Sequence, residues 1–295
     1  TKSAAVADSP LKRLELLNAP AIELYRQHGI DLAAEALEIA VCAQHNNGGL
    51  AANIWWESEN IKGLFPVGEV NGSHGVTRPG GTALNAGQVG AFRAAEFIAA
   101  MRQYEPVCIE DAAWLANSQL EVFRKRMLVP AKLNWREERR KFQTRMSESA
   151  AFVREGRMLA KALAETREQL ALLNADGLGG LDSRALAETL RNGQLLTAQV
   201  LYLETMRKQV GDGVGSRGSS IVIAERGEYI HPSLPPYWQI EKEDASFRGK
   251  VLTARLNAAG EAEMAWEPCR GLPVTDGWFE NVWRACREKK IYGEA

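Results

Sequence analysis

Two glycine-centred segments carry the residue types best suited to holding a flat, partly anionic ligand. The first covers residues 44–50 and reads Gln-His-Asn-Asn-Gly-Gly-Leu. The second covers residues 68–85 and combines a His-Gly step, an arginine and a Gly-Gly step. Paired glycines let the backbone approach a ligand where any Cβ would intrude. We therefore expect the glycine turns around residues 48 and 80 to meet in space and to line one pocket.

A permanent cation and a helix start accompany the second segment. Apolar periodicity predicts a helix from about residue 83 to residue 101. The backbone amides at a helix start carry partial positive charge. Arg78 precedes this helix, and its guanidinium can grip a carboxylate through two hydrogen bonds. The alternative for Arg78 is an ordinary surface ion pair. His45 and His74 share the glycine context, which favours a position near a bound cofactor.

The elements expected to position these residues form a strand, a loop and a helix. Residues 63–69 read as a short buried strand, and the loop 71–81 leads into the helix at 83. The adjacent Trp55 and Trp56 read as packing residues rather than as a base-stacking platform.

The middle of the chain is helical by its apolar spacing. Apolar residues recur near one face from Phe142 to Leu173, and Asp182 or Ser183 is a candidate cap for a second helix that reaches Leu203. The basic residues of 124–145 read as a solvated helix face, with nucleic-acid binding as the weaker alternative. Further along, residues 250–256 and 261–266 predict a β-hairpin, and residues 278–289 a final helix.

The bulk numbers exclude several partner classes. The 295 residues include 36 Lys+Arg and 37 Asp+Glu, so no global field favours nucleic acid or an anionic membrane. No run approaches the roughly 18 apolar residues of a membrane span. The four cysteines form no CxxC pair, and we expect no metal site. A cytoplasmic location is the expectation. Because the chain opens at Thr1 rather than Met, a processed or truncated product is also expected.

Taken together, the two segments resemble a known family. A Gly-Glu step followed by His-Gly-x-x-Arg-x-Gly-Gly and a helix is similar to the flavin-closing segment of the FAD-dependent fumarate reductase/succinate dehydrogenase flavoproteins, and residues 44–50 resemble that family's His-rich x-x-Gly-Gly turn. The resemblance covers about three quarters of the chain. It implies an α+β or α/β fold: an incomplete FAD-binding Rossmann-like portion, then a C-terminal helical bundle and a small β-hairpin region. The implied domains are residues 1–105, with the end of a capping region, 106–215, which are helical, and 216–295, the hairpin and tail.

The resemblance also implies which residues meet FAD. Glu69 resembles the acid that hydrogen-bonds the ribityl or ribose hydroxyls, and His45 occupies a position against the cofactor. Gly80–Gly81 allow close approach of the backbone, and the amides of Ala83 and Leu84 resemble those at the flavin pyrimidine edge. Amide donors at that edge stabilise the reduced flavin.

For the substrate, the resemblance implies a small carboxylate. Arg78 resembles the arginine that binds the substrate carboxylate beside the flavin. Gln44 stands where fumarate and succinate enzymes carry a substrate-binding histidine, so a substrate other than fumarate is expected, with Gln44 helping to orient it. The spacing from Glu69 to Arg78 is also shorter than the family's by about one or two residues, which predicts a shifted loop.

The expected partners follow from what the sequence does not contain. It has no strand followed by G-x-G-x-x-G to hold the FAD pyrophosphate, and the family's proton-donating arginine belongs to an upstream segment. An N-terminal FAD-binding segment, upstream or on a companion chain, is therefore the expected partner of a hydride-transferring enzyme. The alternative function is a non-catalytic assembly or binding subunit that retains the C-terminal half of the fold and docks through its helices.

Overall fold

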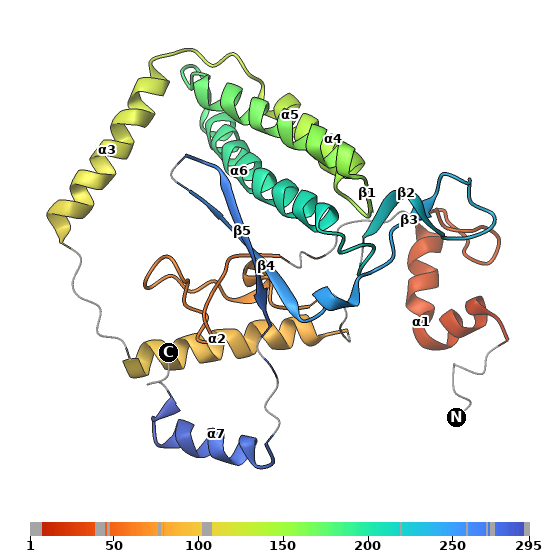
Figure 1. Cartoon of the computed structure of the whole chain (residues 1–295). Helices are drawn as coiled ribbons and strands as arrows, with labels where there is room; N and C mark the ends of the chain where they lie inside the picture. The colour runs from red at the N-terminus through yellow and green to blue at the C-terminus, as the bar shows by residue number, and fades with distance from the viewer. Residues whose placement is uncertain are drawn as a thin grey trace. The chain divides into compact units, whose positions relative to one another are not determined.

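The computed structural model describes residues 8–38, 45, 48–75, 78, 80–101, 108–218, 220–257, 259–269, 271 and 275–291 (Figure 1). These residues fall into two compact units, one within residues 1–44 and the other within 45–295. In the first unit α1 spans Pro10–Gln27, with the Ser9 side chain accepting a hydrogen bond from the Lys12 amide as its N-cap. This helix was not among the predicted elements. It is kinked at Asn18 and contains Pro20, two features that argue against one continuous helix in the sequence.

The second unit begins with irregular chain, and the predicted strand at 63–69 is wrong. Residues 64–67 have no regular structure, and Gly68–Asn71 form a 3-10 helix, η2. Gly68 has a φ of +81°, which turns the chain out of the extended conformation. An apolar run of this length becomes a strand only when a neighbouring strand pairs with it.

The predicted helix after the glycine loop is confirmed as α2, Thr82–Met101. One side of α2 packs closely against the segment before it, because Gly87 faces the Cα of Gly68 and Gly90 faces the Trp56 ring. Trp55 is buried, with 3% of its surface exposed, and its ring stacks on Phe97 at 5.5 Å between centroids. The expectation that Trp55 is a packing residue is thus confirmed.

The helical middle of the chain contains α3 (Ile109–Met127), α4 (Trp135–Ser149), α5 (Gly156–Ala175) and α6 (Ser183–Gly211), and Figure 1 shows the last three side by side. Asp182 is the N-cap of α6, as predicted, and its carboxylate accepts from the Ala185 amide at 2.7 Å. The apolar run from Phe142 to Leu173 is divided between α4 and α5. The short strand β1, Val153–Arg154, separates these two helices and pairs in parallel with a later strand.

Buried side chains of the three packed helices form two adjoining apolar clusters. The members are Ala150, Leu159, Ala162, Leu163, Val200 and Leu203 in one, and Phe142, Leu173 and Leu196 in the other. Polar groups are buried between the same helices. Arg145 of α4 donates to Thr166 of α5 and to Gln199 of α6, each at 3.2 Å. Arg139 likewise donates to Asn192 at 2.9 Å. The expectation that residues 124–145 are merely a solvated basic face is therefore wrong for these two arginines.

Two small sheets complete the unit. Strands β1, β2 (Ile221–Tyr229) and β3 (Gln239–Ile240) form the first, in that order, with β2 and β3 antiparallel. After the short 3-10 helix η3, Ala245–Phe247, the predicted hairpin is confirmed as β4, Lys250–Leu256, paired with β5, Ala262–Pro268. The predicted terminal helix is α7, Trp278–Arg287.

A charged hydrogen bond joins the hairpin to the end of α6 and makes this contact sensitive to acid. The Trp266 indole N–H donates to the Asp212 carboxylate at 2.6 Å, and Lys208 lies 2.9 Å from the same carboxylate. The indole bond first, and then the lysine, lower the pKa of Asp212. A group with a lowered pKa contributes stability above its unfolded-state pKa and loses it as the pH falls through the folded value.

We therefore expect the indole N–H resonance of Trp266 to shift toward the free position as the pH falls below about 4, the ordinary aspartate range. Trp266→Phe identifies the resonance. In Asp212→Asn the amide oxygen still accepts the bond but no longer titrates, so the signal is expected to stay constant. If the Trp266 signal of Asp212→Asn still shifted with pH as it does in the unmodified protein, this assignment would be contradicted.

The architecture confirms the predicted mixed fold, with a helical bundle followed by a small hairpin region. The domain boundaries at residues 105 and 215 stay a prediction. Among the helices of the described ranges, none is long and apolar enough to cross a membrane.

Candidate functional site

The first glycine turn lies directly on the backbone around η2. The Leu50 amide donates to the Val70 carbonyl at 2.8 Å, and the Asn71 side-chain amide donates to the Leu50 carbonyl at 3.0 Å. These bonds join segments about twenty residues apart in the sequence. They hold the Gly48–Gly49 turn against the start of the second glycine segment.

Only glycine fits at this crossing. A Cβ on Gly49 would meet the Val70 carbonyl oxygen and would lie 2.6 Å from the Gly72 amide nitrogen. A Cβ on Gly72, whose φ is +72°, would lie 2.5 Å from the Gly49 amide nitrogen. The close approach at Gly49 is therefore between two backbone segments, and the approach of these glycines to a ligand stays a prediction.

The second Gly-Gly step has different surroundings. A Cβ at Gly80 or Gly81 would meet no described atom within 4 Å. The Gly48–Gly49 turn therefore contacts residues 70–72, whereas we expected it to contact the turn at Gly80. The backbone is closely packed around Gly72, and no described atom lies near the Cβ positions of Gly80 and Gly81.

Three titratable side chains meet beside the crossing. His45 Nδ1 lies 3.3 Å from a Glu69 carboxylate oxygen, and His45 Nε2 lies 3.2 Å from His74 Nδ1. The two imidazole rings contact each other, with centroids 5.0 Å apart and planes inclined by 26°. Glu69 is half-exposed, whereas only 11% of the His45 side chain is exposed. The structure thus brings together two residues predicted for the cofactor and a third, His74, from the second segment.

Arg78 is held by its own loop. Its Nη1 donates to the Gly75 carbonyl at 2.6 Å, and Gly75 has a φ of +79° that allows the loop to turn back. The side chain is partly buried. Ala83 and Leu84 lie in the first turn of α2, and Leu84 is 77% exposed, so this helix start is open on the Leu84 side. Gln44 lies outside the described residues, and its role stays a prediction.

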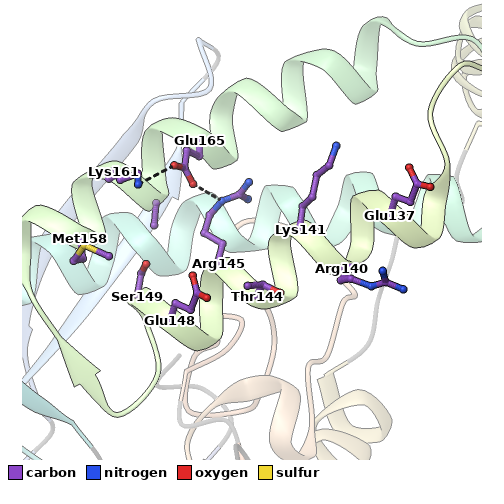
Figure 2. A pocket seen from close by; sticks show the side chains of 11 residues that line it. Glu137, Arg140, Lys141, Thr144, Arg145, Glu148, Ser149, Met158, Lys161 and Glu165 are labelled. Atoms are coloured by element: carbon purple, nitrogen blue, oxygen red, sulfur yellow. Dashed lines mark hydrogen bonds and ion pairs between the residues drawn. The ribbon is translucent and has the colours of Figure 1, made fainter.

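A separate groove of about 620 Å³ runs between α4 and α5, away from every residue predicted for the site (Figure 2). Its lining mixes basic and acidic side chains, some of which are paired. Figure 2 shows Glu165 between Arg145 and Lys161, at 3.3 and 3.8 Å. Two of the basic side chains in this groove are thus already paired with an acid. Within the described ranges, the structure contains no cluster of three or more His, Cys, Asp or Glu that could hold a metal ion.

The sequence did not indicate the pairing of His45 with His74, because 29 residues separate them. It also did not indicate Asn71 as the side chain that braces the first turn. The available signal was the glycine context shared by both histidines.

Comparisons with known proteins identify relatives of the chain. No family model matches the chain. A curated CoM/CoB fumarate reductase polypeptide of Methanothermobacter marburgensis is 28% identical over 194 residues, which cover 63% of this chain and 34% of that protein. The chain thus spans about one third of the length of this relative.

Solved structures show that the fold is shared. An E. coli quinol fumarate reductase aligns with a TM-score of 0.61 at 20% identity, over 91% of this chain and 44% of that chain. A quinol-fumarate reductase with menaquinol molecules gives 0.65 at 21% identity, over the same shares. Mycobacterium smegmatis Sdh1 in complex with UQ1 gives 0.62 at 16% identity, over 96% and 45%. These findings confirm the resemblance read from the glycine segments, and the chain fits a C-terminal portion of a flavoprotein of the fumarate reductase/succinate dehydrogenase family.

Proposed function

We propose that this chain forms the flavin-closing part of an FAD-dependent oxidoreductase that moves a hydride between the flavin and a small carboxylate-bearing substrate. The observation that carries the proposal is the crossing of Gly48–Gly49 with residues 70–72. It assembles His45, Glu69 and His74 a few residues before Arg78 and the start of α2. Relatives of the chain are flavoprotein oxidoreductases, which supports the choice of cofactor.

The described residues fit FAD in two respects. His74 Nε2 is shielded from solvent and has no hydrogen-bond partner among the described residues. An atom of this kind is expected where a bound ligand supplies the partner. Open space surrounds Gly80 and Gly81, so a flat ring system can approach their backbone. FAD would supply the hydride chemistry when bound. The residues proposed to hold it are His45, Glu69, Gly80–Gly81 and the amides of Ala83 and Leu84.

The substrate is held by charge. Arg78, tethered by the Gly75 carbonyl, binds the carboxylate and orients it, and Gln44 assists from the first segment. The first-turn amides of α2 would stabilise negative charge on a bound flavin. Because Gln44 replaces a histidine, the proposed substrate is an activated alkene carboxylate other than fumarate. The proton comes from the companion segment.

Flavin binding by the reconstituted protein tests the proposal. The chain is mixed with FAD, alone and together with the G-x-G-x-x-G-bearing N-terminal segment of a relative, and free flavin is removed by desalting. We expect retained absorbance in the flavin bands when the companion segment is present. A stable complex of the two polypeptides that repeatedly retains no flavin would contradict the proposal.

Such a flavin-free complex is the result expected of the second candidate, a non-catalytic assembly or binding subunit. One observation favours it: neither α3 nor α7 has a buried residue within the described chain, although both carry large apolar side chains. On α7 Trp278, Phe279 and Trp283 are each at least 45% exposed. Helices of this kind are suited to docking against another polypeptide.

A further inference from the structure

When both imidazole rings are neutral, the Glu69–His45–His74 row has one direction. A carboxylate can only accept hydrogen bonds, so the His45 Nδ1 that lies 3.3 Å from Glu69 must carry the hydrogen. A neutral imidazole has one N–H, which leaves His45 Nε2 as an acceptor. The His74 Nδ1 that lies 3.2 Å from it must therefore donate.

The last atom of the row is then an acceptor. With its hydrogen on Nδ1, neutral His74 presents a lone pair at Nε2. This atom is shielded from solvent and has no partner among the described residues. A shielded polar atom without a partner destabilises the fold, so such atoms persist where a function or a ligand accounts for them.

We propose that His74 Nε2 accepts a hydrogen bond from a hydroxyl or N–H group of the FAD cofactor, and that Glu69 acts on the cofactor through His45. This inference rests on the proposed function and adds to it. His74 supplies a further contact with the cofactor, and Glu69 also sets the tautomer of both histidines.

The chemistry of the two ligands assigns this atom to FAD rather than to the substrate. FAD carries several hydrogen-bond donors, namely its ribityl and ribose hydroxyls and the N–H of the isoalloxazine ring. Each of them can donate a hydrogen bond to the lone pair of His74 Nε2. An ionised carboxylate has no hydrogen to donate, and its partner is the cationic Arg78. On this loop, His74 thus binds FAD as a neutral acceptor, and Arg78 binds the substrate carboxylate as a cation.

Imidazole ¹⁵N NMR of the labelled chain tests the direction of the row without any activity measurement. The sequence has four histidines, so each ring can be assigned by single substitutions. At mildly alkaline pH, where free imidazole is neutral, we expect the Nδ1–H tautomer for both His45 and His74.

His28 and His231 are internal standards, because their hydrogen bonds specify opposite tautomers. His28 Nδ1 faces the Leu24 carbonyl at 2.8 Å and must donate, whereas His231 Nδ1 accepts from the Ser233 amide at 3.2 Å. Glu69→Gln, whose amide can donate or accept, is expected to introduce the second tautomer at His74. A single Nε2–H tautomer of His74 in the unmodified chain would overturn the proposal.

Binding of FAD itself is the second readout, measured by titration of the chain with its N-terminal companion segment. We expect His74→Leu to weaken FAD binding about tenfold, as for one lost hydrogen bond, and His74→Gln to weaken it less because its amide oxygen still accepts. The exposed His231→Gln is the matched control and should bind as the unmodified protein does.

The possible outcomes separate the two proposals. Absence of FAD binding in every variant and in the unmodified protein contradicts the proposed function, whatever the tautomers. Normal FAD binding by His74→Leu, or a His74 Nε2 resonance that stays at its position when FAD saturates the protein, contradicts the acceptor role alone. A shift of this resonance toward the hydrogen-bonded range, together with the tenfold loss in His74→Leu, supports it.

Discussion

Replacing Arg78 by glutamine in the flavin-loaded protein is expected to lower kcat/KM for carboxylate substrates by at least about 100-fold, the effect of removing a charge-stabilising donor. The guanidinium is proposed to hold the carboxylate, and its tether to the Gly75 carbonyl determines where it lies. Reoxidation of the reduced flavin by acrylate, crotonate and maleate measures the effect.

The control for this prediction is Arg78→Lys. Lysine retains the charge but not the two-pronged geometry, so its loss should be smaller and should appear mainly in KM. Flavin content and melting temperature must match the unmodified protein in both variants, because Arg78 also braces its loop. Unaltered reoxidation rates in Arg78→Gln at equal flavin content would show that the carboxylate binds elsewhere.

Gly49→Ala is expected to open the crossing of the two segments and to cost about 2–4 kcal/mol, at the upper end of overpacking changes. The added Cβ meets backbone atoms of residues 70–72, which cannot rotate aside as a side chain can. The Leu50–Val70 hydrogen bond must lengthen as the turns separate. Faster amide hydrogen exchange at Leu50 reports the loss locally, and a lower melting temperature reports any global part.

Gly80→Ala is the matched substitution for this experiment. A Cβ at Gly80 meets no described atom within 4 Å, and Gly80 is not among the described glycines of positive φ. Its effect on exchange at Leu50 should be small. Equal exchange rates in Gly49→Ala and Gly80→Ala would contradict the steric argument. A loss of FAD binding in Gly80→Ala with normal exchange would place Gly80 at the cofactor, as predicted.

Elements with a strong local signal were predicted well. The helix after the glycine loop, the Asp182 cap and the hairpin all follow from periodicity, capping chemistry and turn residues that lie within a few positions of one another. The strand at 63–69 was wrong because a strand depends on a partner that its own residues do not specify, and Gly68 turns the chain away. The helix α1 was missed because Pro20 lies inside it, next to a kink at Asn18, and proline normally interrupts a helix.

The divided helix and the buried arginines depended on packing. Apolar spacing alone cannot show that Phe142 and Leu173 belong to different helices, since an interruption of a few residues leaves the pattern nearly intact. Arg139 and Arg145 have the composition of a solvated face, and become partly buried because Asn192, Thr166 and Gln199 on neighbouring helices accept their hydrogen bonds. Such partners satisfy a charge that would otherwise not be buried.

The sequence by itself determined the two glycine segments, their order, Arg78 before a helix and hence the family resemblance, because each of these is a property of consecutive residues. Only the tertiary structure decided that Gly49 lies on Gly72 and that Glu69, His45 and His74 form one row. Contacts across 20 to 30 residues depend on how the intervening chain turns. The direction of that row, and with it the free acceptor at His74, follows from a three-dimensional arrangement of hydrogen-bonding atoms that no local pattern specifies.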